Sequence, residues 1–224
     1  MLATMDPDQP LHLPVVAIVF DCDGVLVDSD ASVASSWARW AAELGLDAHE
    51  VTNHAHGQRS ADTVRSYVQP ADRPRYEALI ERFEVEDAPT VTAMPGAVAL
   101  AASVPRDRWG VVTSGSRILS SARLAAARIP QPPFVVTADD VTHGKPHPEG
   151  YLAAFGRLGV DPARGAVAED SAAGIRAALE AGTGWVIGVG TAALPTDAHV
   201  VVRHLGAVRW TGDGLLVEAA GRLR

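Results

Sequence analysis

Short apolar runs alternate with amphipathic segments along most of the chain. Val15–Phe20 carries no charge, follows Pro14 and precedes an acidic loop, which is typical of a buried strand. The same pattern recurs at Trp109–Thr113, Phe134–Thr137, Gly165–Ala168 and Trp185–Val189. Helical patterns lie between these runs, at Arg117–Arg128, Pro148–Leu158 and Ser171–Ala181. Strands that alternate with helices predict an α/β fold built on a doubly wound parallel sheet.

One region interrupts the alternation. Between Asp30 and Ala88 the sequence has helical patterns and no strand pattern. The expected helices lie at 32–44, 49–56, 60–68 and 74–86. Such an insertion between the first two strands predicts a lid, with hinges at 27–29 and 89–95. We therefore expect a core of residues 1–28 and 93–224 and an α-helical cap of residues 29–92. Near the end of the chain, Arg209–Glu218 predicts a hairpin around Gly212-Asp213-Gly214.

Composition and charge exclude several classes of protein. With 47% hydrophobic and 21% charged residues among 224, the chain is globular in composition rather than disordered. A net charge of −8 argues against nucleic acid or an anionic membrane as the main partner. The single cysteine, Cys22, excludes an internal disulfide and fits a reducing compartment. Neither a secretory signal pattern nor a long apolar stretch is found, so we expect a cytoplasmic protein.

Two carboxylates follow the first strand, in Asp21-Cys22-Asp23-Gly24. Residues i and i+2 of an extended chain point the same way, so Asp21 and Asp23 share a site. Two like charges this close require a metal ion, or one of them must hold a proton. Oxygen ligands of this kind suit Mg²⁺. An acidic turn or a helix cap is the alternative interpretation.

Further polar clusters follow three of the later strands. Thr113-Ser114-Gly115 offers hydroxyl and amide groups that suit an anion, although small polar residues also cap helices. Lys145, the chain's only lysine, lies on a stiff loop between Gly144 and Pro146, and its compact charge can serve a carboxylate and a phosphate together. Glu169-Asp170 is a second acidic pair. Because ligands bind at the carboxyl ends of the strands in such sheets, all these clusters are expected to converge on one crevice.

Four segments of the sequence together resemble the motifs of a known family. The segments FDCDGVLVDS, VTSGS, GKPHPEGY and AEDSAAGI, in this order, resemble the four motifs of the haloacid dehalogenase-like hydrolases with an inserted α-helical cap. The resemblance covers residues 14–205. It implies an α/β fold, a doubly wound Rossmann-like parallel sheet with the cap inserted after the first motif.

The resemblance also implies roles for the motif residues. Asp21 would be the nucleophile that forms an aspartyl-phosphate, and Asp23 the general acid and then the base. Thr113 and Lys145 would hold the phosphoryl oxygens, with Ser114 and Gly115 beside them at the substrate. The implied metal ligands for Mg²⁺ are Asp21, Asp23 through its main-chain carbonyl, Asp170, and Glu169 through a metal-bound water. Family members that cleave carbon–halogen bonds lack the second aspartate, so dehalogenation is disfavoured.

The cap carries a further set of candidates. His56-Gly57-Gln58-Arg59 begins a pattern that is similar to cap segments of sugar and polyol phosphatases in the family. His56 and Gln58 are candidates for hydrogen bonds to substrate hydroxyls, and Arg59 for a phosphate or hydroxyls. A surface arginine at a helix start is the alternative for Arg59.

We therefore expect a Mg²⁺-dependent phosphatase whose partner is a small phosphorylated metabolite, most readily a sugar or polyol phosphate, in a monomer or small homo-oligomer. A beta-phosphoglucomutase-type enzyme is one alternative, although Val33 stands where that mutase has a histidine. A phosphatase for phosphoglycolate or a nucleotide is another. A binding protein that has kept the fold is the third, against which the complete set of Asp21, Asp23, Lys145 and Asp170 argues.

Overall fold

The computed structural model describes residues 6, 8–55 and 57–224 of the chain. A central parallel sheet has the strand order β6-β5-β2-β7-β8-β9. Its strands are β2 (Ala17–Asp21), β5 (Trp109–Val112), β6 (Val135–Val136), β7 (Gly165–Glu169), β8 (Trp185–Val189) and β9 (Val200–Val202). Every residue of β2 is buried, as expected for a strand inside a sheet that is covered on both faces.

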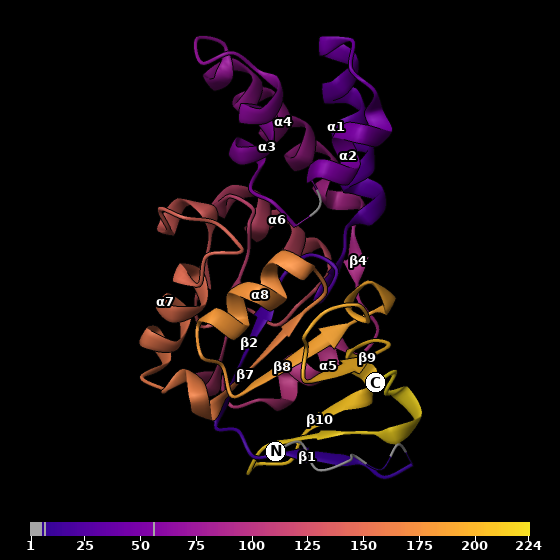
Figure 1. The fold of residues 1–224 in the computed structure, drawn as a ribbon, viewed down its shortest axis with the longest axis vertical. Coiled ribbons are helices and arrows are strands. Elements are labelled where there is room, and N and C mark those ends of the chain that lie inside the picture. Colours follow the sequence, from indigo (N-terminus) through magenta and orange to yellow (C-terminus); the bar gives the residue numbers. More distant parts are fainter. Residues whose placement is uncertain (1–5, 7, 56) are drawn as a thin grey trace.

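Helices cover the two faces of this sheet (Figure 1). On one face α7 (Glu149–Leu158) and α8 (Ala172–Glu180) enclose a core that contains Val19, Tyr151 and Ile175. On the other face α5 (Ala97–Ser103) and α6 (Arg117–Ala126) join a core that contains Phe20. Val19 and Phe20 belong to different cores because successive side chains of a strand point to opposite faces. The predicted α/β class and doubly wound sheet are confirmed.

Four helices form a separate group at one end of the molecule, here named the helical insertion (Figure 1). They are α1 (Asp30–Leu44), α2 (Ala48–Ala55), α3 (Ser60–Tyr67) and α4 (Arg73–Asp87). Trp37 and Trp40 are buried in its core with their rings 5.2 Å apart, and Nε1 of Trp40 donates to the carbonyl of Tyr76. Both tryptophans therefore pack within the insertion, and Trp37 also lines the pocket described below.

The two connections to the insertion lie side by side. β3 (Val27–Asp28) pairs antiparallel with β4 (Thr92–Ala93), in the segments where the hinges are predicted. The division into a core of 1–28 and 93–224 and a cap of 29–92 stays a prediction.

A small antiparallel sheet closes the opposite end of the molecule (Figure 1). It has the order β1 (Leu11–Leu13), β11 (Leu215–Val217) and β10 (Val208–Trp210), so the predicted hairpin is confirmed. The sequence patterns did not predict β1, β9 or α5. Across residues 8–55 and 57–224, no helix combines the length and the apolar character needed to cross a membrane.

Candidate active site

A pocket lies where the carboxyl ends of β2, β5 and β7 meet the helical insertion. The core contributes residues from all the polar clusters named above, and the insertion contributes side chains from α1, α3 and α4. The charged residues that line this pocket are Asp21, Asp23, Asp30, Glu84, Arg123, Lys145 and Asp170. We refer to it as the active-site pocket.

A tight loop brings Asp21 and Asp23 to this pocket. Asp21 is the last residue of β2, and the carbonyl of Cys22 accepts hydrogen bonds from the amides of Leu26 and Val27, both at 2.9 Å. Gly24 has a φ of +73°, in the left-handed region that glycine adopts without strain. A Cβ on Gly24 would lie 2.1 Å from Oδ2 of Asp170, so the absence of a side chain here lets that carboxylate approach the loop.

Lys145 connects two of the carboxylates. Its Nζ lies 2.5 Å from Oδ1 of Asp21 and also donates to Oε1 of Glu169. The ammonium is buried, 5.5 Å from the centre of the Tyr151 ring. Burial alone disfavours the ammonium, but Asp21 and Glu169 outweigh that effect and raise the pKa of Lys145 well above its usual value. Lys145 is therefore a fixed positive charge at the base of the pocket.

Glu169 is held in one orientation by hydrogen bonds on both oxygens. Oε2 accepts from the amide (2.7 Å) and the hydroxyl (2.9 Å) of Ser171, and Oε1 accepts from the Tyr151 hydroxyl at 3.2 Å. A Cβ on Gly174 would lie 1.7 Å from Oε1, so a glycine in α8 makes room for the carboxylate. Ser171 also caps α8 by accepting from the Gly174 amide, as its sequence position indicates.

Three carboxylates gather tightly enough to bind a divalent cation. Oxygens of Asp21, Glu169 and Asp170 all lie within 4.8 Å of one another. Burial raises the pKa of both Asp21 and Asp170, and although Lys145 opposes this, the neighbouring carboxylates add to it. A cation with oxygen ligands would offset this excess of negative charge. The donor set fits Mg²⁺, which binds through one or two carboxylates and keeps several waters.

The Asp23 side chain makes its contacts outside this cluster of three carboxylates. Its Oδ1 accepts from the Ser29 hydroxyl at 2.7 Å and from Nη1 of Arg123 at 2.9 Å. Arg123 lies on α6 and is buried, and its Nη2 lies 3.4 Å from Oε1 of Glu84 on α4. The Ser60 hydroxyl donates to the other oxygen of Glu84 at 3.1 Å. A chain of hydrogen bonds therefore runs from Asp23 in the core to α3 and α4 in the insertion.

Arg123 and Glu84 were not predicted as site residues. Both interrupt an apolar helix face, since Arg123 shares the buried face of α6 with Leu119 and Leu124, and Glu84 lies one turn after the buried Ile80. A charge on such a face must find a partner, because an unpaired buried charge is expensive. A charged residue on an apolar helix face was therefore the signal by which the sequence could have identified Arg123 and Glu84. It does not show which residue each of them pairs with.

The cluster that follows β5 forms another wall of the site. The Thr113 hydroxyl is buried and accepts from the Gly115 amide at 3.0 Å, and Thr113 lines a smaller pocket next to Lys145. Ser114 and Gly115 line the active-site pocket, and the Ser114 hydroxyl donates to the carbonyl of Gly57 at 3.3 Å. Ser114 thus contacts the connection between α2 and α3.

The predicted residues of the insertion differ in their surroundings. Gln58 lines the active-site pocket. The Arg59 guanidinium donates to both oxygens of Asp62, at 2.7 and 3.2 Å, and to the carbonyl of Thr142 at 3.0 Å. Arg59 therefore joins α3 to the loop before Lys145, and it lines the two pockets beside the active-site pocket. His56 lies outside the described residues.

Comparisons with known proteins identify the family. Residues 15–182 match the model of a family described as haloacid dehalogenase-like hydrolase. Hexitol phosphatase A of Escherichia coli is 37% identical over 172 residues, which cover 73% of this chain and 78% of that protein. Glycerol-1-phosphate phosphohydrolase 2 of Saccharomyces cerevisiae is 33% identical over 195 residues, covering 82% and 78%.

Solved structures share the fold. The structure of a beta-phosphoglucomutase from Clostridium difficile superposes with a TM-score of 0.76 at 22% identity, covering 86% of this chain and 92% of that one. The chain belongs to the haloacid dehalogenase-like hydrolases, and the family and enzyme class expected from its motifs are confirmed.

Proposed function

We propose that this phosphatase hydrolyses a small phosphomonoester, a sugar or polyol phosphate, through an aspartyl-phosphate on Asp21 and with Mg²⁺ as cofactor. The observation that carries the proposal is the position of Asp21, whose Oδ1 lies 2.5 Å from the Lys145 ammonium in the pocket that Asp23 also lines. A carboxylate beside a fixed cation, in a pocket that also holds a second carboxyl group, provides a nucleophile and a proton donor for covalent phosphoryl transfer.

In the first half of the reaction, an oxygen of Asp21 attacks phosphorus while the bond from phosphorus to the ester oxygen breaks. Asp23 gives its proton to the departing alkoxide, which leaves as an alcohol. Lys145 offsets negative charge on the phosphoryl oxygens, and the groups of Thr113, Ser114 and Gly115 hydrogen-bond them.

In the second half, a water molecule attacks the phosphorus of the aspartyl-phosphate. Asp23, now a carboxylate, takes the proton of this water, and the Asp21 carboxylate leaves. Inorganic phosphate is released, and both aspartates return to their starting forms. Hydrogen bonds from Ser29 and Arg123 hold Asp23 in place for both proton transfers.

Mg²⁺ would be held by Asp21 and Asp170, with the Asp23 carbonyl and Glu169 completing its surroundings. When bound, it supplies positive charge that offsets the carboxylates and the phosphoryl oxygens. The close grouping of three carboxylates supports this assignment.

The side of the pocket formed by the insertion supports a polyhydroxylated leaving group. Gln58, Ser60 and Glu84 line it, and Arg123 of α6 in the core lies beside Glu84, so this side has both hydrogen-bond donors and acceptors, as a row of hydroxyls requires. The relatives named above, a hexitol phosphatase and a glycerol-1-phosphate phosphohydrolase, favour the same substrate class. Val33 lines the pocket where the mutase of the family has its histidine, which favours release of phosphate over its transfer back to the sugar.

A phosphate-release screen tests the proposal. Hexitol phosphates, glycerol 1-phosphate, hexose phosphates, phosphoglycolate and nucleoside monophosphates are compared, each with Mg²⁺ and with EDTA. We expect kcat/KM for the best sugar or polyol phosphate to exceed that for the other classes by at least about tenfold, and EDTA to abolish turnover until Mg²⁺ is restored. Preference for phosphoglycolate or a nucleotide would reject the substrate class, and full turnover in EDTA would reject the metal. Conversion of glucose 1-phosphate to glucose 6-phosphate without phosphate release would favour the mutase.

A further inference from the structure

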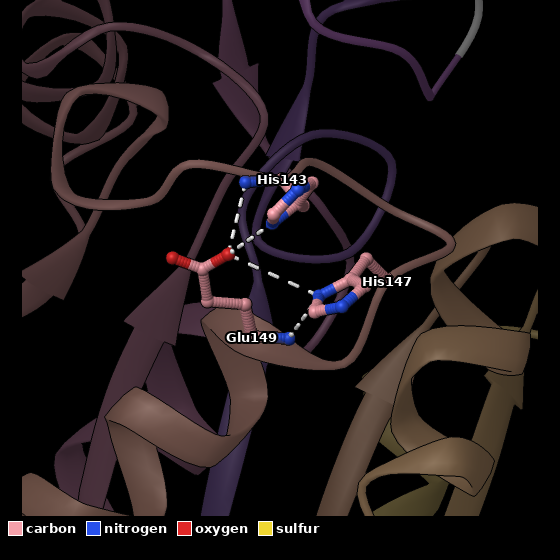
Figure 2. Close-up of side chains that lie close together, drawn as sticks. All are labelled: His143, His147 and Glu149. Carbon is pink, nitrogen blue, oxygen red and sulfur yellow. Dashed lines mark hydrogen bonds and ion pairs between the residues drawn. The ribbon is translucent and has the colours of Figure 1, made fainter.

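Two histidines on the loop that carries Lys145 and a glutamate at the start of α7 gather together, and the proposed reaction uses none of the three. Figure 2 shows the side chains of His143, His147 and Glu149 turned toward one another. Nδ1 of His143 donates a hydrogen bond to Oε2 of Glu149 at 3.0 Å, and Nδ1 of His147 lies 3.9 Å from the same oxygen. One nitrogen or oxygen from each of the three residues lies within 4.8 Å of the other two.

These distances match the ligand spacing around a small transition-metal ion. Zn²⁺ binds imidazole nitrogen and carboxylate oxygen at about 2.1 Å, which places neighbouring ligands of a tetrahedral site about 3.4 Å apart. The observed 3.0 and 3.9 Å lie on either side of that value. Two imidazoles and one carboxylate form a donor set that suits Zn²⁺ better than Mg²⁺, which prefers oxygen.

The ligands are ordered by their surroundings before any ion binds. The Glu149 carboxylate accepts from the amides of Thr142 (2.8 Å) and His143 (2.9 Å), which fix its orientation. The amide of Glu149 donates to Nδ1 of His147 at 3.3 Å, which leaves that nitrogen unprotonated, the form in which imidazole binds a metal. An ion would replace this long hydrogen bond and also the one from His143 to Glu149, with release of the proton on Nδ1 of His143.

The cluster is open to solvent on one side. The side chains of His143 and His147 are 63% and 52% exposed, so an ion can enter and water can complete its coordination. The loop beneath them is braced, since Arg59 packs against Gly144 and donates to the carbonyl of Thr142.

We propose that His143, His147 and Glu149 form a second metal site, which binds Zn²⁺ or a similar transition-metal ion. This site is separate from the three carboxylates of Asp21, Glu169 and Asp170. The site has three protein ligands and at least one position for water. Because Lys145 lies between two of its ligands in the sequence, a bound ion also fixes the loop that presents the ammonium to Asp21.

The test is a Zn²⁺ titration of the full-length protein after chelator treatment, followed by calorimetry and thermal unfolding. Excess Mg²⁺ is kept present so that the carboxylates of Asp21, Glu169 and Asp170 do not take up Zn²⁺. We expect one Zn²⁺ per chain and a melting temperature that rises with Zn²⁺ concentration. In the double variant His143→Gln/His147→Gln we expect binding to weaken at least about a hundredfold and the melting temperature to lose its dependence on Zn²⁺.

A matched control removes exposed histidines from elsewhere. His49→Gln/His54→Gln changes two histidines of α2 and should keep the Zn²⁺ affinity of the wild type. Co²⁺ in place of Zn²⁺ should give visible absorption bands of a coordinated ion, which disappear in the His143/His147 variant. Equal Zn²⁺ affinity in the wild type and that variant, or no binding in the wild type, would overturn the proposal. Since these measurements do not involve phosphate release, their failure leaves the proposed phosphatase activity unaffected.

Discussion

Nζ of Lys145 lies 2.5 Å from Oδ1 of Asp21, although 124 residues separate them in the chain. Both side chains are more than nine-tenths buried. A buried ion pair of this kind contributes little net stability, but loss of one partner leaves the other charge buried and uncompensated. The pair therefore fixes the orientation of Asp21 more than it stabilises the fold.

The change Asp21→Asn removes the proposed nucleophile while keeping the shape of the side chain. We expect turnover of p-nitrophenyl phosphate to fall at least about a thousandfold, with an unchanged circular dichroism spectrum. Asp28→Asn is the matched control, because Asp28 is exposed, lies in β3 and does not line the pocket. That variant should retain turnover within about twofold of the wild type. Near-normal turnover in Asp21→Asn would reject covalent catalysis by this residue.

Glu84→Gln tests the role of the insertion in substrate choice. The change keeps the side-chain volume but removes the charge that faces Arg123, so hydrogen bonds to substrate hydroxyls are weakened. We expect KM for the best polyol phosphate to rise about tenfold, and KM for p-nitrophenyl phosphate, which has no such hydroxyls, to change less than about threefold. Glu43→Gln, at an exposed position of α1, is the control. An equal rise in KM for both substrates would show that Glu84 has no part in recognising hydroxyls.

Gly24→Ala tests the close approach of Asp170 to the aspartate loop. Gly24 and Gly182 have similar φ values, +73° and +76°, but a Cβ would meet Asp170 at 2.1 Å in the first and nothing within 4 Å in the second. Gly182→Ala should cost about 1 kcal/mol of unfolding free energy for the backbone alone. Gly24→Ala should cost at least about 1 kcal/mol more and should also reduce phosphatase turnover. Denaturant titrations measure the change in unfolding free energy. Equal losses of unfolding free energy in Gly24→Ala and Gly182→Ala would contradict the steric argument.

Asp140 makes the stability of the core sensitive to acid. Partial burial would raise its pKa, but hydrogen bonds from the Thr137 amide and hydroxyl and from Arg117 outweigh burial and lower the pKa of Asp140 from 3.8 to about 2. A depressed folded-state pKa contributes stability above about pH 4, and this contribution is lost as the pH falls through about 2. After allowance for solvent screening, we expect Asp140→Asn to lower the unfolding free energy at pH 6 by about 1 kcal/mol.

That difference between Asp140→Asn and the wild type should shrink as the pH approaches 2. Denaturant titrations at several pH values measure it. A difference that stays constant from pH 6 to pH 2 would show that the charge of Asp140 does not contribute. Asp139→Asn is the neighbouring comparison, because Asp139 accepts from the Arg117 amide instead of from Thr137.

The fold class and the residues that meet at the edge of the sheet could be predicted from the sequence alone. Buried apolar runs that alternate with helices require parallel strands, and the carboxyl ends of parallel strands share one edge. Asp21, Lys145 and Asp170 therefore had to converge, however far apart they lie in the chain. The long helices of the insertion were predicted for the same reason, since hydrophobic periodicity is a local property.

The pairing of charges, by contrast, depends on how the elements pack in the folded protein. Arg123 and Glu84 form an ion pair across the pocket, and Arg59 is bound by Asp62 and the Thr142 carbonyl. A charged residue in a helical pattern is compatible with solvent, substrate or a buried partner, because its environment depends on the element packed against it. The three-residue strands β1 and β9 were missed for a related reason. A segment of three residues is too short for its own pattern to identify a strand, and β1 in addition pairs with β11, near the other end of the chain.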